Sequence, residues 1–355
     1  MKEVQPVPLP GPIAFFGSGE ISPSGQNIFS AILSKLDSEP LVSILETPAG
    51  FELNSPQVAQ KVADFLDHHL RNFHPRTKVI PARKKDGQFS TNNPEILLDL
   101  LKSQLIFMGP GSPTYAVRVL QDSLAWDYIQ AAHRAGVGLA FSSAATIAVS
   151  SKALPVYEIY KAGQDLHWKA GLNLLAPYGL DLVFIPHWNN REGGKGLDTS
   201  RCFMGLKRFH SLRKLLPSRT KILGIDEHTG LVMDFHTERC RVVGSGSAHL
   251  LTEEKETSFP ADSEFKLSEL GSYHNPQPLS GIRPGIAEQA REMQSQEPPE
   301  PDQKILQLAE NRQTARDQHH WGEADRLRDQ IERAGWMIED TESGYRLTPK
   351  RQNLD

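Results

Sequence analysis

The sequence predicts an α/β fold, in which helices cover both faces of a parallel sheet to give three layers. Three observations favour this class. Short apolar, β-branched runs recur over the first two thirds of the chain, successive runs are roughly 20 to 40 residues apart, and helical patterns fill several of the intervals. Strands and helices that alternate at this spacing are typical of βαβ units, whose parallel sheet is buried on both sides.

The predicted strands are short and almost free of charged residues. They cover residues 13–16, 41–46, 77–82, 105–108, 137–141, 182–186 and 221–225. Helical patterns at 55–71, 94–101 and 123–135 lie between them, and a further helix opens at Ser112 and Pro113. Serine is a favoured cap and proline is favoured in the first turn of a helix, so the start of this last helix is well specified.

After Gly230 the pattern changes to two strand-like segments, "GLVMDF" and "CRVVGSGSAHLL", joined by the polar "HTER". We expect an antiparallel hairpin at the edge of the sheet, which closes a first domain over residues 12–255. Residues 256–300 are rich in Pro, Ser, Gln and Glu and show little apolar periodicity. This composition predicts a linker.

Residues 301–349 predict a small separate unit. Two helices form a hairpin, Gly335 stands where a helix commonly ends in glycine, and "WMIEDTESGYRL" predicts two short strands around a Ser-Gly turn. The apolar positions that recur at three- and four-residue steps are Leu306, Ala309, Ala315, Trp321, Ala324, Leu327 and Ile331.

Composition and charge exclude several classes of protein. The formal net charge of -4 gives no long-range attraction to nucleic acid or to an anionic membrane. The start, "MKEVQPVPLPGP", has no apolar core of a signal peptide, and no run approaches the roughly 18 to 20 apolar residues of a membrane span. Cys202 and Cys240 are too few for a disulfide framework. We therefore expect a cytoplasmic protein with no membrane partner, in which both cysteines are buried.

The stretch "LAFSSAATIA", residues 139–148, predicts a sharp turn from strand to helix that carries two adjacent serines. A nucleophile on such a turn needs small residues two positions before and after it. These flanks are Ala140 and Ala144 for Ser142, but Phe141 and Ala145 for Ser143. Sterics alone favour Ser142 as the nucleophile, and a purely structural turn is an equally good interpretation.

Other chemistry-bearing residues follow neighbouring strands. His187 comes directly after the strand at 182–186, where a general base would be needed, although a lone histidine is more often structural. Glu158 or Asp165 could orient its imidazole, and Glu158 is the better candidate because apolar residues flank it. The turn that holds Gly109 and Gly111 presents backbone N–H groups that could bind an oxyanion.

Two arginines in the loop after His187 are candidates for binding a substrate carboxylate. They are Arg191 and Arg201, since a guanidinium can hold a carboxylate with two parallel hydrogen bonds. Solvent-facing loop charges are the alternative interpretation. In the first loop, "FFGSGE" lacks the third glycine of a dinucleotide fingerprint because Ser22 occupies that position, so no nucleotide cofactor is expected.

Taken together, residues 12–250 resemble the class I glutamine amidotransferase-like superfamily, in particular its serine-peptidase branch of aspartyl dipeptidase (peptidase E) and cyanophycinase. "SSAATIA" is similar to the family's "TSAGAIV", which implies that Ser143 is the nucleophile. The family's "NPHF-T-N" segment is similar to Pro186, His187, Trp188 and Asn190, which implies that His187 is the base.

The resemblance has further implications for the site. The acidic member of the family's triad lies about fifteen residues after the nucleophile, which falls on Glu158. The family's "GGGE" and "GGN" loops resemble the segments that hold Gly19 and Gly111, and "GIDEHTGLVM" (224–233) resembles a "GIDE-x-TA" segment of cyanophycinase-like chains. The sequence departs from the family at the elbow, where Phe141 and Ala145 replace its two glycines.

The tail resembles the C-terminal domain of bacterial cysteinyl-tRNA synthetases, which implies contact with tRNA. From residue 301 onward, nine Lys or Arg stand against eleven Asp or Glu, so strong nonspecific RNA affinity is not expected, and an internal docking or dimerisation module is the alternative. The matching residues are Arg312, Ala315, Arg316, Trp321, Ala324, Asp325, Arg328, Gly335, Glu339, Asp340, Thr341 and Gly344.

The sequence therefore predicts a flavodoxin-like α/β domain that acts as a serine hydrolase on a peptide or amide bond. Ser143 or Ser142 attacks, His187 moves the proton, Glu158 orients the imidazole, and the N–H groups of Gly111 and Ala144 bind the oxyanion. No metal or cofactor is expected. The alternative is a catalytically inactive binding protein whose tail contacts tRNA or a protein, and the edge hairpin or the tail could mediate a homodimer.

Overall fold

The computed structural model of the chain describes residues 9–36, 39–277, 279–295, 301–341 and 344–349. It divides into two compact units, Met1–Met293 and Gln294–Asp355, which are described separately below. The first unit has a large, mostly parallel sheet with helices on both faces, so the predicted α/β class is confirmed.

The eight-stranded sheet has the order β14-β11-β10-β1-β5-β4-β2-β3. Its parallel part consists of the first five predicted strands, and the ends of each lie within two residues of the prediction. These strands are β1 (Ile13–Phe16), β2 (Leu41–Leu45), β3 (Arg76–Ile80), β4 (Leu105–Met108) and β5 (Gly138–Ser142).

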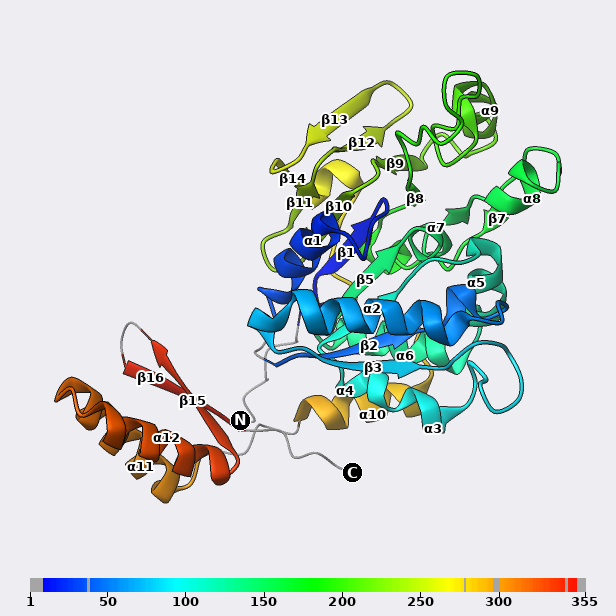
Figure 1. The fold of residues 1–355 in the computed structure, drawn as a ribbon. Coiled ribbons are helices and arrows are strands. Elements are labelled where there is room, and N and C mark those ends of the chain that lie inside the picture. The colour runs from blue at the N-terminus through cyan, green and yellow to red at the C-terminus, as the bar shows by residue number, and fades with distance from the viewer. Residues whose placement is uncertain (1–8, 37–38, 278, 296–300, 342–343, 350–355) are drawn as a thin grey trace. The chain divides into compact units, whose positions relative to one another are not determined.

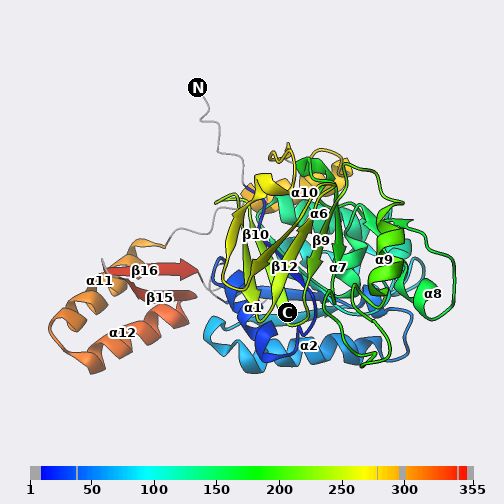
Figure 2. The same ribbon diagram turned by 90° about the horizontal axis from the view of Figure 1, so that it is seen from above.

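Successive side chains of each strand enter different layers of the core. In β1, Ile13 and Phe15 belong to one apolar cluster, whereas Ala14 and Phe16 belong to the other. The helices α1 (Pro23–Leu33) and α2 (Ser55–His69) pack on the face of Phe16. The opposite face is covered by α3 (Pro94–Leu97), α4 (Asp99–Lys102), α5 (Pro113–Leu120), α6 (Leu124–Arg134), α7 (Ala144–Ala148) and α10 (Pro284–Ser295). Figures 1 and 2 show these layers.

A second sheet corrects the prediction for the strands at 182–186 and 221–225. They form β8 (Leu182–Ile185) and β9 (Lys221–Ile225), which pair in parallel with each other but not with the large sheet. This sheet has the order β13-β12-β9-β8. An apolar run predicts that a strand is buried, but it does not identify the strand's neighbour.

The hairpin expected after Gly230 is present as β10 (Thr229–Asp234) and β11 (Arg239–Gly244), and β10 pairs antiparallel with β1. The predicted second strand is, however, two strands, because the chain turns at Gly244 (φ 117) and continues as β12 (Ser247–Leu251) in the other sheet. The outermost strand at this edge is β14 (Glu264–Lys266).

Most of the expected linker at 256–300 is structured and part of the first unit. It contains β13 (Glu256–Pro260), β14, the 3₁₀ helix η4 (Leu267–Leu270) and α10. A few well-spaced apolar side chains form the buried face of each element. The surrounding polar residues dominate the composition, so these side chains do not stand out in the sequence. They are Phe265, Leu267, Leu270, Ile282, Ile286, Ala287 and Ala290. Residues 278 and 296–300 lie outside the described residues.

Shorter elements fill the connections of the first unit. They are η1 (Thr47–Ala49), η2 (Arg71–Phe73), β6 (Lys152–Ala153), α8 (Val156–Tyr160), β7 (Lys169–Ala170), η3 (Ala176–Tyr178) and α9 (Gly205–Arg213).

The second unit is the predicted helical hairpin followed by a β-hairpin. Its elements are α11 (Gln303–Asp317), α12 (Trp321–Arg333), β15 (Trp336–Thr341) and β16 (Gly344–Pro349). Gly335 follows α12 with φ 85, as expected for a helix that ends in glycine. The side chain of Arg312 is buried and donates two hydrogen bonds to Asp340. Ser343 of the predicted turn lies outside the described residues.

Replacing Phe265 tests the correction to the linker. Its ring is 3% exposed and stacks on Phe259 at a centroid distance of 4.0 Å. We expect Phe265→Ala to lower the free energy of unfolding by about 3–5 kcal/mol in denaturant titrations followed by circular dichroism. The adjacent surface variant Glu264→Ala should change it by less than about 1 kcal/mol. Equal effects of the two variants would contradict the packed arrangement.

Candidate active site

Three side chains of different strand ends meet in the first unit. Ser143 comes directly after β5, and His187 and Glu227 come two residues after the ends of β8 and β9. The carboxyl ends of parallel strands collect loops and helix starts at one edge, which is where reactive groups are found in open α/β sheets. Here the serine comes from the large sheet, and the histidine and glutamate come from the small one.

Ser143 occupies a sharp turn between β5 and α7. Its backbone has φ 51 and ψ -108, an unfavourable conformation for a residue with a side chain. The turn presents Oγ to the imidazole, 2.9 Å from Nε2 of His187. Strained backbone at a serine between a buried strand and a helix is the geometry of a nucleophile elbow.

Ser142 points elsewhere. It is fully buried, and its Oγ donates a hydrogen bond of 2.7 Å to Oε2 of Glu20 in the loop after β1. The aromatic ring of Phe141, which sequence reasoning placed in the way of a turn at Ser143, lies instead in the core with its centroid 5.8 Å from that of Phe15. Of the two serines left open by the sequence, Ser143 is the one that contacts the histidine.

The carboxylate beside the imidazole is Glu227, and the choice of Glu158 is corrected. Oε1 of Glu227 lies 3.0 Å from Nδ1 of His187. Glu158, on α8, instead has its carboxylate 3.5 Å from Nζ of Lys169. Glu227 is the fourth residue of "GIDEHTG" and directly follows Asp226 at the end of β9. The position of Glu227 just after a buried strand was the signal in the sequence that could have identified it. The spacing along the chain from the serine pointed to Glu158 instead.

A second donor fixes the Glu227 carboxylate. Nδ2 of the buried Asn190 donates to the same oxygen, Oε1, at 2.8 Å. The hydrogen bond from His187, with that from Asn190, lowers the pKa of Glu227 although partial burial opposes the shift. Glu227 is therefore held as a carboxylate, which favours the imidazole tautomer with its proton on Nδ1 and leaves Nε2 free to accept from Ser143.

Backbone contacts with the first loop hold His187 and Glu227 in place. His187 has φ 51, and its N–H donates to the carbonyl of Gly17 at 3.1 Å. A side chain on Gly17 would place Cβ 2.0 Å from the carbonyl oxygen of Asp226, next to Glu227. Gly19 has φ 76, and a Cβ there would meet the ring of His228 at 2.6 Å. The glycines of this loop are thus required for close packing.

The candidate oxyanion loop runs from Gly109 to Ser112. Gly111 has φ 145, and a Cβ there would lie 2.0 Å from the carbonyl oxygen of Pro48 in η1. The same carbonyl accepts a hydrogen bond of 2.8 Å from the N–H of Ser112, whose hydroxyl caps α5 as predicted. Gly111 and Ala144, the residue after the serine, are the backbone donors proposed for the oxyanion.

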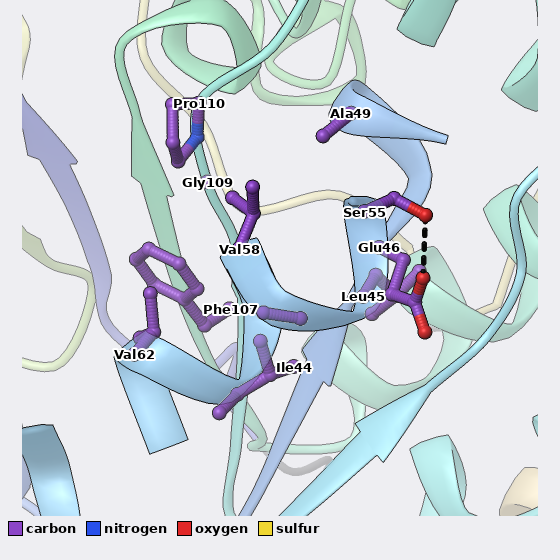
Figure 3. Close-up of a pocket in the computed structure, with 11 residues that line it drawn as sticks. Ile44, Leu45, Glu46, Ala49, Ser55, Val58, Val62, Phe107, Gly109 and Pro110 are labelled. Atoms are coloured by element: carbon purple, nitrogen blue, oxygen red, sulfur yellow. Dashed lines mark hydrogen bonds between the residues drawn. The ribbon is translucent and has the colours of Figure 1, made fainter. Parts of the chain in front are cut away.

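A charged pair stands at the start of η1, where the buried carboxylate of Glu46 meets the partly exposed Arg83. Glu46 is 3% exposed, and its carboxylate accepts hydrogen bonds from Arg83 at 2.7 and 3.2 Å and from Ser55 at 2.8 Å. Figure 3 shows Glu46 and Ser55 on one side, and Gly109 and Pro110 on the other side, of a cavity of about 10 Å³, which is close to the lower limit for one water molecule. This packing fixes the segment against which the oxyanion loop rests.

The two candidate arginines differ in structure. The Arg201 guanidinium lies 3.8 Å above the ring of Trp188 and donates to that residue's carbonyl at 3.1 Å, so it is used within the protein. Burial lowers the pKa of Arg201. Arg191 is exposed in the loop between His187 and α9. The structure therefore leaves Arg191, but not Arg201, available to a substrate.

Among the described residues, no group of three or more His, Cys, Asp or Glu side chains is arranged to hold a metal ion. None of the described helices is both long enough and apolar enough to cross a membrane. Cys202 and Cys240 are buried, as predicted, and burial raises the pKa of both thiols.

Comparison with known proteins supports the fold. No protein-family model and no curated protein matches the sequence. Among solved structures, the chain is similar to a peptidase from an acI-B1 Actinobacterium, with a TM-score of 0.58, 23% identity, and coverage of 73% of this chain and 97% of the other. It also matches a putative peptidase E protein from Listeria monocytogenes EGD-e, with a TM-score of 0.40, 14% identity, and coverage of 71% and 100%.

The Glu227 carboxylate should make stability depend on pH. Because the folded state lowers its pKa, Glu227 stabilises the protein above its unfolded pKa of about 4.3, and this contribution is lost as the pH falls through the folded pKa. We expect the difference in unfolding free energy between wild type and Glu227→Gln to be largest near pH 6 and to shrink toward pH 3.

The check is a series of denaturant titrations across this pH range. Asn190→Ala should raise the pKa of Glu227, since it removes a donor to the carboxylate. In this background, the stability difference that Glu227→Gln produces should therefore disappear at a higher pH than it does in the wild type. A difference that stays constant with pH would contradict the proposed electrostatic role of Glu227.

Proposed function

We propose that the first unit is a serine hydrolase that cleaves a peptide or amide bond through Ser143, His187 and Glu227. The observation that carries the proposal is the continuous chain of contacts from Ser143 Oγ to His187 Nε2 at 2.9 Å and from His187 Nδ1 to Glu227 Oε1 at 3.0 Å. The strained backbone of Ser143 supports it, because strain of this kind is typical of a nucleophile held for reaction.

Each group has a defined part in the reaction. The imidazole of His187 takes the hydroxyl proton as Ser143 attacks the carbonyl carbon, and later gives it to the leaving amine. Glu227 stabilises the imidazolium that forms between these steps, and Asn190 fixes the carboxylate. The N–H groups of Gly111 and Ala144 donate to the oxyanion, and a water molecule then releases the acyl group by the reverse proton path.

The contact between Ser143 and His187 also separates the two hypotheses raised by the sequence. A catalytically inactive binding protein would be favoured by a serine and an imidazole too far apart for proton transfer, beyond about 5 Å. The distance of 2.9 Å lies within hydrogen-bonding range and favours the hydrolase. Contact of the second unit with tRNA, or dimerisation through it, stays a prediction of the sequence.

A fluorophosphonate probe tests the nucleophile. It reacts with activated serine hydroxyls, so we expect it to label the wild type and not Ser143→Ala, as read by mass spectrometry of the modified peptide. Ser142→Ala is the matched control one residue away. It should be labelled, because the hydroxyl that it removes binds Glu20. Labelling lost only in Ser142→Ala would overturn the assignment.

The two glutamates give a second matched pair. We expect Glu227→Gln to slow labelling by about 10²-fold or more, and His187→Ala by about 10²–10⁴-fold. Glu158→Gln should label at the wild-type rate, because its carboxylate lies beside Lys169 rather than the imidazole. If Glu158→Gln slowed labelling more than Glu227→Gln did, Glu158 would be the acidic residue, as expected from the sequence.

A further inference from the structure

A second histidine, His249 on β12, contacts the residue after the proposed base and the residue before the proposed acid. Its ring stacks on the indole of Trp188, with the centroids 5.4 Å apart and an angle of 23° between the planes. Its Nε2 lies 3.2 Å from Oδ1 of Asp226. Trp188 directly follows His187, and Asp226 directly precedes Glu227. One side chain thus touches both segments that carry the His187–Glu227 contact.

The carboxylate of Asp226 is buried and has two donors. Asp226 is 8% exposed, and its other oxygen, Oδ2, accepts a hydrogen bond of 2.9 Å from the N–H of Ser247 at the start of β12. An ionised carboxylate only accepts hydrogen bonds, so the contact with His249 places a proton on Nε2 of that ring. A buried acceptor that loses its donor is costly, and the segment that carries it then shifts to find another partner. The donor on His249 therefore helps to fix the chain at Asp226, one residue before Glu227.

The indole of Trp188 ties the segment of the base to β9. Trp188 is 2% exposed, and its N–H donates to the carbonyl of Ile225 at 3.0 Å. A side chain on Gly224 would place Cβ 2.4 Å from the indole, so the glycine is what allows this ring to lie against the strand. Gly224 is also the residue opposite His249 in the pairing of β9 with β12. The imidazole of His249 and the indole are thus neighbours on the strand that leads to Glu227.

The other ring nitrogen of His249 has partners on a different strand. Its Nδ1 lies 2.9 Å from the hydroxyl of Ser258 on β13, and 3.8 Å from the carboxylate of Glu256 on the same strand. With the proton on Nε2, Nδ1 accepts from the serine hydroxyl. The strand order β13-β12-β9-β8 places β13 at the edge of the small sheet, whereas Asp226 follows β9. The two nitrogens therefore have separate partners, and their contributions can be measured separately.

We infer that His249 is a positioning residue for the proposed hydrolase. Its Nε2–H holds the carboxylate of Asp226, and this contact keeps Glu227 at hydrogen-bonding distance from His187. The inference rests on the proposed function and adds a residue that acts through the acid of the triad. Its effect on rate follows from geometry, because a displacement of about 1 Å in a catalytic site costs up to about 10²-fold.

Two amide variants test the role of Nε2. The amide nitrogen of Gln reaches the position of Nε2, and that of Asn reaches the position of Nδ1, so His249→Gln keeps a donor to Asp226 and His249→Asn does not. Both lose the ring that stacks on Trp188, so the difference between them reports the contact with Asp226. We expect the fluorophosphonate to label Ser143 in His249→Asn at least about 10-fold more slowly than in His249→Gln, per folded molecule. Ser258→Ala removes the partner of Nδ1 alone and should be labelled at the wild-type rate.

A proton resonance gives a readout that does not require reaction. The Nδ1–H of His187, bonded to Glu227, should give a downfield proton signal in Ser143→Ala, assigned by its loss when His187→Ala is added. We expect His249→Gln to retain this signal and His249→Asn to move it upfield, whereas a loss of stability alone would weaken it without moving it. Equal labelling rates in the two amide variants, or an unmoved signal in His249→Asn, overturn the inference. A signal that responds as expected in a chain that the probe never labels overturns the proposed function instead, and leaves the positioning of the pair intact.

Discussion

The close approach of the loop after β1 to the loop after β9 is the contact on which the site depends. Gly17 lies so near the Asp226 carbonyl that no side chain fits between them, its N–H donates to Thr229 at 2.8 Å, and its carbonyl accepts from His187. The contacts of Gly17 with Asp226 and His187 join the large sheet, which carries Ser143, to the small sheet, whose strands β8 and β9 precede His187 and Glu227. A shift of one sheet by an ångström would separate the hydroxyl from the imidazole, and geometry of this kind tolerates little displacement.

Polar pairs hold the segments around the proposed triad in place. Ser142 binds Glu20 and thereby ties the elbow to the first loop, whereas Asn190 binds Glu227 and ties the acid to the loop of the base. Next to η1, whose Pro48 carbonyl holds the oxyanion loop, the buried carboxylate of Glu46 pairs with the partly exposed Arg83. Side chains that are held by neighbours in this way lose little freedom during a reaction, which is how a site is preorganised.

Local features of the fold could be predicted from the sequence, but the strands that pair and the side chains that meet could not. The apolar runs gave the parallel strands to within two residues, and Ser112, Pro113 and Gly335 marked helix ends by their intrinsic backbone preferences. Periodicity reports burial and not pairing, so the second sheet was missed. The choice of Glu158 failed for a related reason, because spacing along the chain does not say which carboxylate a fold brings to an imidazole. Residues 256–295 were missed because few apolar residues there form the buried faces.

The division of the proposed triad between two sheets has a consequence for how the proposed function could be lost in evolution. His187 and Glu227 follow adjacent strands of the same sheet, and their contact does not involve position 143. A descendant that exchanged this serine for an inert residue would keep the imidazole–carboxylate pair intact. Among diverged copies of this fold, a preserved pair is therefore no evidence of turnover, and the elbow residue is the informative one.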